Sequence, residues 1–256
     1  MGETVVNQST ERFLQVQTVA ISQPVKWLQR GWDDLVHHRG ASLAYGLLVT
    51  ALGWVILMFA MTHVYFMAAA ISGFMLFGPI MATGLCELSR RQCLGEATTF
   101  DASIDALGRH PVALRHFALL LFALSLFWFL ISGILLEALL GQPSPSMGEI
   151  LWGNMLASVT SPLLVLYLAI GGLLAVITFV LSVVSVPVIL ERGVDAMEAM
   201  QLSARVTVAN LPAMLVWSAL IVLLSMLGFA TFLLGMILIY PLLGHATWHA
   251  YQDLVR

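Results

Sequence analysis

Residues Val112–Leu140 read VALRHFALLLFALSLFWFLISGILLEALL, and this stretch decides the fold class. It is longer than the roughly 20 helical residues that cross a bilayer core of about 30 Å. Because every backbone N–H and C=O must be bonded internally in hydrocarbon, a run of this length is predicted to be a membrane helix. It lacks the alternation of apolar and polar residues that marks a strand of a membrane barrel. We therefore expect an all-α membrane helix bundle.

The composition of the whole chain supports this class. Of 256 residues, 60% are hydrophobic and only 10% are charged, whereas soluble domains are about a quarter charged. The net charge of −3 argues against a nucleic-acid partner, because such proteins carry a basic excess. Two cysteines exclude a disulfide framework. The expected surroundings are membrane lipids.

Six apolar runs predict six transmembrane helices. They are 41–62, 64–85, 112–140, 162–190, 211–227 and 230–249. The last two runs are separated only by the short segment Leu227–Thr231, so one long tilted helix, giving five crossings, is the alternative at this point.

The orientation follows from lysine and arginine, which stay preferentially on the cytoplasmic side. With six crossings, all 11 basic residues fall on one face. The opposite loops, including residues 141–161, contain none. We therefore expect a multi-pass protein of the bacterial inner membrane with both termini in the cytoplasm. Residues 1–23 are predicted to be a polar cytoplasmic segment without a signal peptide, because the first long apolar run starts only at Ala41.

The remaining residues, 24–256, are predicted to form a single membrane domain of three hairpins. Each hairpin follows a short amphipathic helix, which gives pseudo-repeats 24–95, 96–192 and 193–256. The first amphipathic helix starts at Ser22-Gln23-Pro24, and its Trp27 and Trp32 are expected to lie as interfacial anchors at headgroup depth.

The second and third amphipathic helices have recognisable N-terminal signals. Thr98-Thr99-Phe100-Asp101 opens one that stops at Gly108. Asp195, with Glu198 three residues later, opens the other. The acidic residues of all three helices are expected to form solvated faces and caps; they are Asp33, Asp34, Asp101, Asp105, Asp195 and Glu198.

No Asp, Glu, Lys, Arg or His falls at mid-depth in a predicted crossing. Because such residues usually mark ion or proton pathways, this argues against an ion-coupled transporter, a pump or an intramembrane protease. No catalytic residue and no cofactor is predicted, and an enzyme is the less favoured reading. Cys86 and Cys93 are interpreted as an incidental pair.

Histidine offers a weak metal candidate. His245 and His249 are four residues apart and therefore share a helical face, as metal-binding pairs do. No second paired motif accompanies them, so a structural role for these interfacial histidines is favoured and no metal is predicted.

Small residues give candidates for helix packing. Ser42 and Gly46, Ala69 and Gly73, and Gly78 and Ala82 each recur at four-residue spacing, which lets helix backbones approach closely. Packing within the bundle is the favoured reading. Self-association or binding of a protein partner is the alternative.

Two parts of the sequence resemble an uncharacterised bacterial family of six-helix membrane proteins, catalogued as a domain of unknown function. The first part is Trp27–Asp34 followed by Gly40-Ala41-Ser42-Leu43-Ala44-Tyr45-Gly46. The second is Gly78-Pro79-Ile80 through Gly84–Arg91. The resemblance implies an inner-membrane location and six helices. Some members carry the loose label putative cytochrome c oxidase, but the family offers no functional residue to carry over.

Three functions follow as hypotheses. The first is a non-catalytic accessory or scaffold protein, associated with a respiratory complex. The second is a carrier or binder of lipid or another uncharged hydrophobic solute. The third is a metal or haem protein that uses His245 and His249.

Overall fold

The computed structural model describes residues 15–60, 65–140 and 162–256, with side chains given except at 59–77, 79, 80 and 140. The helices of these ranges are α1 (Gln23–His37), α2 (Arg39–Ala60), α3 (Tyr65–Leu94), α4 (Phe100–Ile104), η1 (Asp105–Gly108), α5 (Pro111–Leu140), α8 (Pro162–Ser182), α9 (Ser185–Arg192), α10 (Ala196–Ala209), α11 (Leu211–Ala230) and α12 (Met236–Leu254). The described residues contain no strand longer than one isolated bridge, so the all-α class is confirmed.

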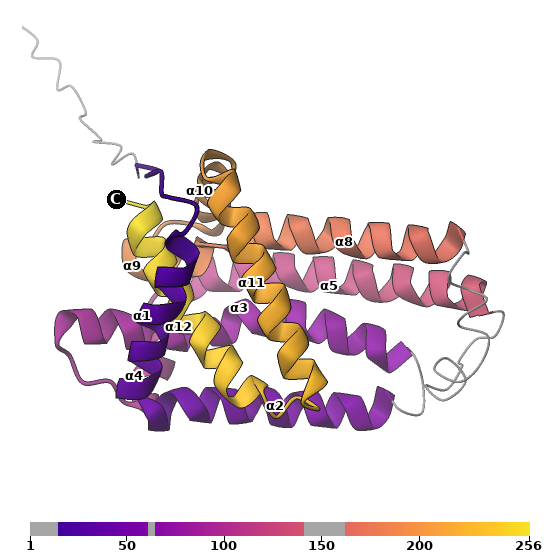
Figure 1. Cartoon of the computed structure of the whole chain (residues 1–256), viewed down its shortest axis with the longest axis horizontal. Coiled ribbons are helices and arrows are strands. Elements are labelled where there is room, and N and C mark those ends of the chain that lie inside the picture. Colours follow the sequence, from indigo (N-terminus) through magenta and orange to yellow (C-terminus); the bar gives the residue numbers. More distant parts are fainter. Residues whose placement is uncertain (1–14, 61–64, 141–161) are drawn as a thin grey trace, which may run out of the picture.

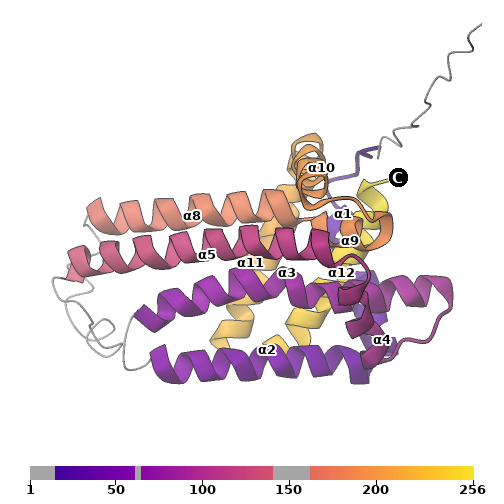
Figure 2. The ribbon, with the colours of Figure 1, turned by 180° about the vertical axis from the view of Figure 1, so that it is seen from behind.

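Four long helices, α2, α3, α5 and α8, run side by side along the long axis of the molecule (Figures 1 and 2). α11 and α12 are inclined to them, and α12 packs against α2 and α3 (Figure 1). The short helices α1, α4, α9 and α10 gather at one end, where the chain also terminates (Figure 1). We call this the termini end.

The predicted amphipathic helices begin at the expected signals. α1 starts at Gln23 with a proline in its first turn. The hydroxyl of Thr99 accepts from the N–H of Ala102 at the start of α4, and Asp195 accepts from the N–H of Glu198 at the start of α10. Side-chain acceptors at these positions satisfy N–H groups that have no partner within the helix. The second of these helices is interrupted, because α4 passes into the 3₁₀ turn η1 before Gly108.

Four stretches of the described residues are long and apolar enough to cross a membrane: Arg39–Met58, Pro111–Leu139, Pro162–Arg192 and Leu211–Ala230. Half or less of each is buried inside the protein. The remaining apolar surface therefore faces outward, as expected of helices whose solvent is lipid. The predicted total of six crossings in three hairpins stays a prediction.

The apolar segment near the C-terminus forms two helices, not one. α11 ends at Ala230 and α12 begins at Met236. Between them the backbone turns through Phe232 and Leu233, which have φ angles of 52° and 67°. The alternative of one long tilted helix is therefore excluded.

The largest buried cluster lies at the termini end rather than among the long helices. It joins Trp27 of α1, Ile189 of α9, Leu202 of α10 and Trp248 of α12. An isolated bridge pairs Val16 with Val255 and fixes the first described residues beside the C-terminus. This end is thus the most tightly packed part of the described molecule, and it positions the polar groups described next.

Candidate functional site

Five buried side chains from four helices form one continuous hydrogen-bonded chain at the termini end. Ser42 Oγ lies 2.9 Å from His245 Nε2, and Ser89 Oγ lies 2.8 Å from His245 Nδ1. Ser89 also donates to Asp34 Oδ2 at 2.5 Å, and His249 Nε2 lies 2.9 Å from that same oxygen. We call this chain the Asp34 network. It connects α1, α2, α3 and α12.

Local helix geometry explains why these groups meet. His245 and His249 are one turn apart on α12 and therefore face the same way. On α1, Trp27, Gly31 and Asp34 recur at the spacing of one helix face, so Asp34 points inward with the buried tryptophan. Gly31 is in contact with the α12 backbone, and a Cβ there would lie 2.8 Å from the amide nitrogen of Ala246. The missing side chain lets α1 and α12 approach.

The Asp34 carboxyl is held in its ionised form. Burial raises its pKa, but the hydrogen bonds from His249 and Ser89 outweigh burial and leave the pKa below its usual value. All five members of the Asp34 network are almost inaccessible to solvent. Its polar atoms are already paired with one another.

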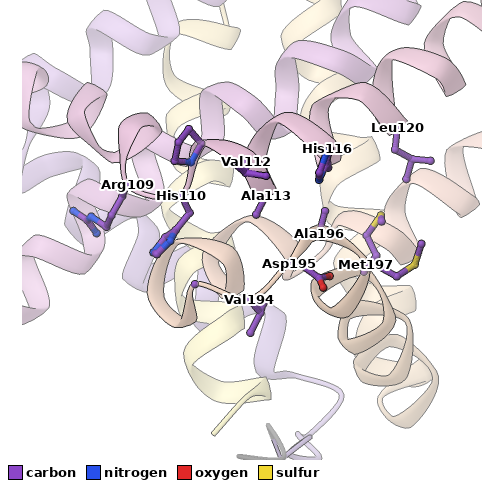
Figure 3. A pocket seen from close by; sticks show the side chains of 13 residues that line it. Arg109, His110, Val112, Ala113, His116, Leu120, Val194, Asp195, Ala196 and Met197 are labelled. Atoms are coloured by element: carbon purple, nitrogen blue, oxygen red, sulfur yellow. The ribbon is translucent and has the colours of Figure 1, made fainter.

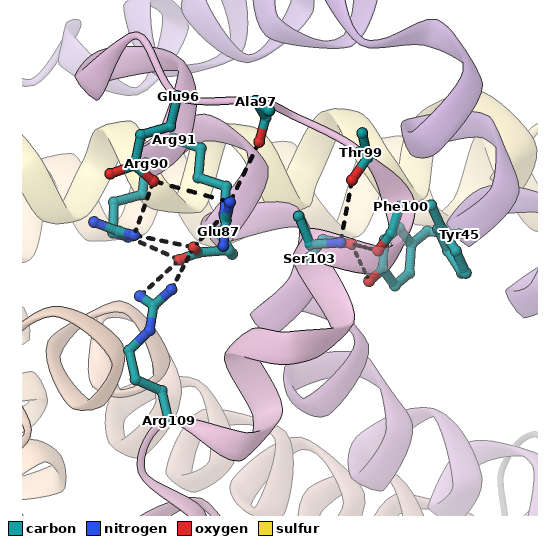
Figure 4. A network of polar contacts seen from close by, with 11 residues as sticks. Tyr45, Glu87, Arg90, Arg91, Glu96, Ala97, Thr99, Phe100, Ser103 and Arg109 are labelled. Carbon is teal, nitrogen blue, oxygen red and sulfur yellow. Dashed lines mark hydrogen bonds and ion pairs between the residues drawn. The ribbon is translucent and has the colours of Figure 1, made fainter.

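A second carboxylate at the same end binds three arginines (Figure 4). Arg90 Nε and Arg91 Nε lie 2.8 and 2.7 Å from the Glu87 oxygens, and Arg109 reaches both oxygens from the loop before α5. We call these four residues the Glu87 cluster. Burial raises the pKa of Glu87, but the arginine hydrogen bonds outweigh burial and lower it to about 2.

The same view shows a smaller contact between α2 and α4. Tyr45 Oη and Ser103 Oγ are 2.8 Å apart, and Ser103 also donates to the Phe100 carbonyl (Figure 4). The rings of Tyr45 and Phe100 pack with centroids 5.0 Å apart. The polar contact thus fixes the short helix α4 against the start of the bundle.

A pocket of about 800 Å³ opens between the start of α5 and the start of α10 (Figure 3). Arg109, His110 and His116 supply its polar groups, and Asp195 lies on the opposite wall. Its apolar part includes Leu120 and Met200. A pocket of this size suits a small molecule or part of a lipid.

The histidines singled out as a weak metal pair are both buried on α12, where their ring nitrogens face hydroxyl, carboxylate or amide oxygens. Within the described ranges, no three His, Cys, Asp or Glu side chains are arranged to hold a metal ion. The prediction of no metal stays a prediction. His245 and His249 bond to oxygen atoms of neighbouring side chains, as expected if their role is structural.

The two tryptophans expected at headgroup depth differ in their exposure. Trp32 is 48% exposed, whereas Trp27 is fully buried. Trp27 donates from Nε1 to Asp253 at 2.8 Å and packs edge-on against Trp217, with centroids 5.6 Å apart. The position of Trp27 differs from the expectation because α11 and α12 cover that face of α1, which only the tertiary structure reveals.

The small residues are in several environments. Ser42 belongs to the Asp34 network, and a Cβ on Gly46 would collide with the carbonyl of Ile237, so α2 and α12 are in backbone contact there. The Gly78 carbonyl accepts from Tyr240 Oη at 2.5 Å, whereas Ala82 is only partly buried. The side chain of Ala69 and the surroundings of Gly73 lie outside the described residues. Self-association through these positions stays a prediction.

Sequence reasoning missed Asp34, Ser89 and the Glu87 cluster. Asp34 was expected on a solvated face, which is wrong because it is 5% exposed. The sequence does contain an indication that Asp34 is buried, because Asp34 shares the helix face of Trp27 and Gly31. In the same way, Arg90 and Arg91 follow Glu87 at the spacing that brings helix side chains together. Ser89 carries no comparable signal, because isolated serines are common in membrane helices.

Comparison with known proteins supports the membrane assignment. Residues 66–191 match a family model described as "Predicted integral membrane protein (DUF2189)". The resemblance inferred from the sequence is thereby confirmed, although its first part, Trp27–Gly46, lies outside the matched segment. Neither curated proteins nor solved structures give a match. The segment 66–191 is thus similar to the DUF2189 family of predicted integral membrane proteins.

Proposed function

We propose that the chain is a non-catalytic accessory or scaffold protein of the bacterial inner membrane, with the termini end in the cytoplasm. One observation carries this proposal. The titratable side chains of the Asp34 network and the Glu87 carboxylate are buried, and each is bonded to partners within its own group, which for Glu87 are three partly exposed arginines. In this arrangement they join helices and offer little to a substrate.

The surface that would meet a partner is the outer side of the amphipathic helices. Trp32 of α1 and Met197 and Val208 of α10 are large apolar side chains that stay exposed at the termini end. Exposed aromatic and methionine side chains are typical of protein interfaces. The tightly packed cluster beneath them would hold this surface in a fixed shape.

The test is purification from native membranes in polymer-bounded discs, followed by mass spectrometry of the copurifying proteins. We expect a stoichiometric membrane-protein partner that is lost in Trp32→Ala and retained in Val55→Ala, an exposed apolar change on α2. Respiratory association predicts that this partner is a subunit of an electron-transfer complex. A chain that purifies alone would overturn the scaffold proposal, and a partner of another kind would overturn the respiratory association alone.

A second candidate function, binding of a lipid or similar amphiphile, is favoured by the pocket in Figure 3. Its polar groups, Arg109, His110 and His116, lie at the start of α5, where a cytoplasmic headgroup would be found, and Leu120 and Met200 provide an apolar wall. The arginines of the Glu87 cluster outnumber its carboxylate, which would favour an anionic headgroup.

Filling the pocket tests this candidate. Met200→Trp should remove a lipid that copurifies with the wild-type chain, as measured by native mass spectrometry and lipid analysis. Val208→Trp adds the same ring on α10 at an exposed position that does not line the pocket. An identical lipid complement in both variants and the wild type would exclude lipid binding in this pocket.

A further inference from the structure

The connection between α11 and α12 is unusually apolar for a turn. Residues 229–235, here called the hairpin tip, read Phe-Ala-Thr-Phe-Leu-Leu-Gly, and no Asp, Glu, Lys or Arg occurs between Arg205 and Asp253. Phe229, Phe232 and Leu234 are all more than half exposed. A turn in water normally carries Gly, Asn, Asp, Ser or Pro. The composition of the hairpin tip therefore fits surrounding lipid rather than water.

The backbone of the hairpin tip is bonded as hydrocarbon requires. Each of the nine successive N–H groups from Thr231 to Ile239 donates a hydrogen bond to an acceptor within the hairpin, including the Gly235 N–H to Thr231 Oγ1 at 2.8 Å. Unpaired backbone groups cost several kcal/mol in lipid, so non-helical backbone survives there only when its groups are paired.

Helix α2 donates hydrogen bonds to two carbonyls of the turn, of which the Leu233 carbonyl also accepts from the Met236 N–H. Trp54 Nε1 donates to the Phe232 carbonyl at 2.8 Å, and Thr50 Oγ1 donates to the Leu233 carbonyl at 3.2 Å. Among the described residues, Phe232 and Leu233 are the two non-glycine residues with positive φ, a conformation that is unfavourable for bulky side chains and persists only where contacts hold it. The contacts with α2 thus fix the hairpin tip at a defined depth.

The depth of the hairpin tip can be measured along two helices, α2 and α3. Thr50 and Trp54 lie about 16–22 Å along α2 from Arg39, at a rise of 1.5 Å per residue, in a bilayer core of about 30 Å. The hydroxyl of Tyr240 on α12 donates to the carbonyl of Gly78 on α3. Gly78 lies about 20 Å along α3 from the far end of that helix at Tyr65. Phe232 is only eight residues from Tyr240, which corresponds to about 12 Å at the helical rise, and α12 itself begins at Met236.

Both measurements place the hairpin tip roughly 8–14 Å short of the far ends of α2 and α3. Figure 1 shows the same arrangement, with the turn between α11 and α12 beside α2 and before that helix ends. Although α11 is long enough to span by length and composition, it is inclined to α2 and so reaches less far across.

We propose that α11 and α12 form a re-entrant hairpin, which enters and leaves the bilayer at the termini end and whose tip contacts lipid acyl chains. The complete crossings are then α2, α3, α5 and α8, in place of the six predicted from the sequence. The C-terminus remains on the same side as the N-terminus in either arrangement, so a reporter fused to the C-terminus does not distinguish them. Depth must be measured at the hairpin tip itself.

Single cysteines labelled with a small fluorophore provide that measurement. In a Cys86→Ala and Cys93→Ser background, Phe232→Cys is compared with Leu48→Cys, about halfway along α2, and Met58→Cys, near its far end. The labelled chains are reconstituted in phosphatidylcholine vesicles that contain nitroxides at the headgroup or at carbon 12 of an acyl chain. All three positions are exposed on the protein surface.

A re-entrant hairpin predicts that the Phe232→Cys label is quenched like Leu48→Cys, more strongly by the carbon 12 nitroxide than by the headgroup nitroxide. It also predicts that a membrane-impermeant maleimide leaves unlabelled Phe232→Cys unmodified from either side. In a separate control chain that carries only Cys86→Ala, the native Cys93, which is exposed, should react from one side. Quenching of Phe232→Cys like Met58→Cys, or its modification by the maleimide, would overturn the proposal. If Phe232→Cys does not fold, Phe229→Cys replaces it and the same two outcomes decide.

Discussion

The two buried carboxylates at the termini end, Asp34 and Glu87, have opposite kinds of partner. Glu87 binds three arginines, whose charge does not depend on pH in the physiological range. Asp34 binds a serine hydroxyl and one histidine, and a second histidine lies beyond that serine. Both carboxylates join separate segments of the chain, but the Glu87 cluster consists of charged groups alone, whereas the Asp34 network also contains hydroxyls and histidines.

The comparison indicates how a membrane protein with few charges uses them. The Glu87 cluster is held by ion pairs, so it fixes the end of α3 to the loop before α5 at any pH above about 4.5. The Asp34 network relies on hydrogen bonds among one carboxylate, two hydroxyls and two histidines. We therefore expect the first to contribute more stability and the second to be more easily altered.

The largest effect is expected from Glu87→Gln. This change leaves three arginines facing one another without their buried anion, and breaking a buried ion pair on one side costs about 3–5 kcal/mol. The measurement is the free energy of unfolding in mixed micelles, by titration with sodium dodecyl sulfate. Arg109→Gln is the control, because it leaves Glu87 two arginines. If Arg109→Gln destabilises as much as Glu87→Gln, the carboxylate is not the centre of the cluster.

Acid should act mainly through Glu87. Its pKa is about 2 in the folded chain, against 4.5 for an unperturbed glutamate. Because the folded-state pKa is the lower one, the ionised carboxylate stabilises the fold above about pH 4.5, and this contribution is lost as the pH falls from about 4.5 to about 2. Thermal stability in detergent should drop over that range. The thermal stability of Glu87→Gln should change less over the same pH range. If the stability of the variant and that of the wild type fall in parallel, Glu87 is not the group responsible.

Asp34→Asn should cost less, about 1–3 kcal/mol, because the amide oxygen can still accept from Ser89 while the charged acceptor of His249 is lost. The same titration with dodecyl sulfate measures it. Asp33→Asn is the matched control, since Asp33 is exposed on the adjacent position of α1. A loss at Asp34 that equals or exceeds the loss at Glu87 would reverse the ranking of the two carboxylates.

The smallest effect is expected at the end of the Asp34 network. Ser42→Ala removes one hydrogen bond to His245, which keeps its contact with Ser89, so the expected loss is about 0.5–1.5 kcal/mol. Ser218→Ala serves as the control, because Ser218 bonds the Leu215 carbonyl of its own helix. Equal and negligible losses in both variants would show that Ser42 contributes no more than an ordinary serine.

Local signals predicted the helices well. The start of α10 follows from Asp195 and Glu198, and α5 follows from an apolar run that differs from the observed helix by one residue. The site was predicted in part. His245 and His249 were placed on one helix face, but their partners Asp34 and Ser89 come from helices more than 150 residues away. Spacing along one helix cannot reveal which other helix covers it.

By itself, the sequence determined that lipid surrounds most of this chain and where several helices begin, because apolar run length, caps and helix-breaking residues act locally. Only the tertiary structure decided that Trp27 and Asp34 face inward and that α2 holds the turn between α11 and α12. These are contacts between distant segments, and the same residues would be exposed if α12 did not lie against α1.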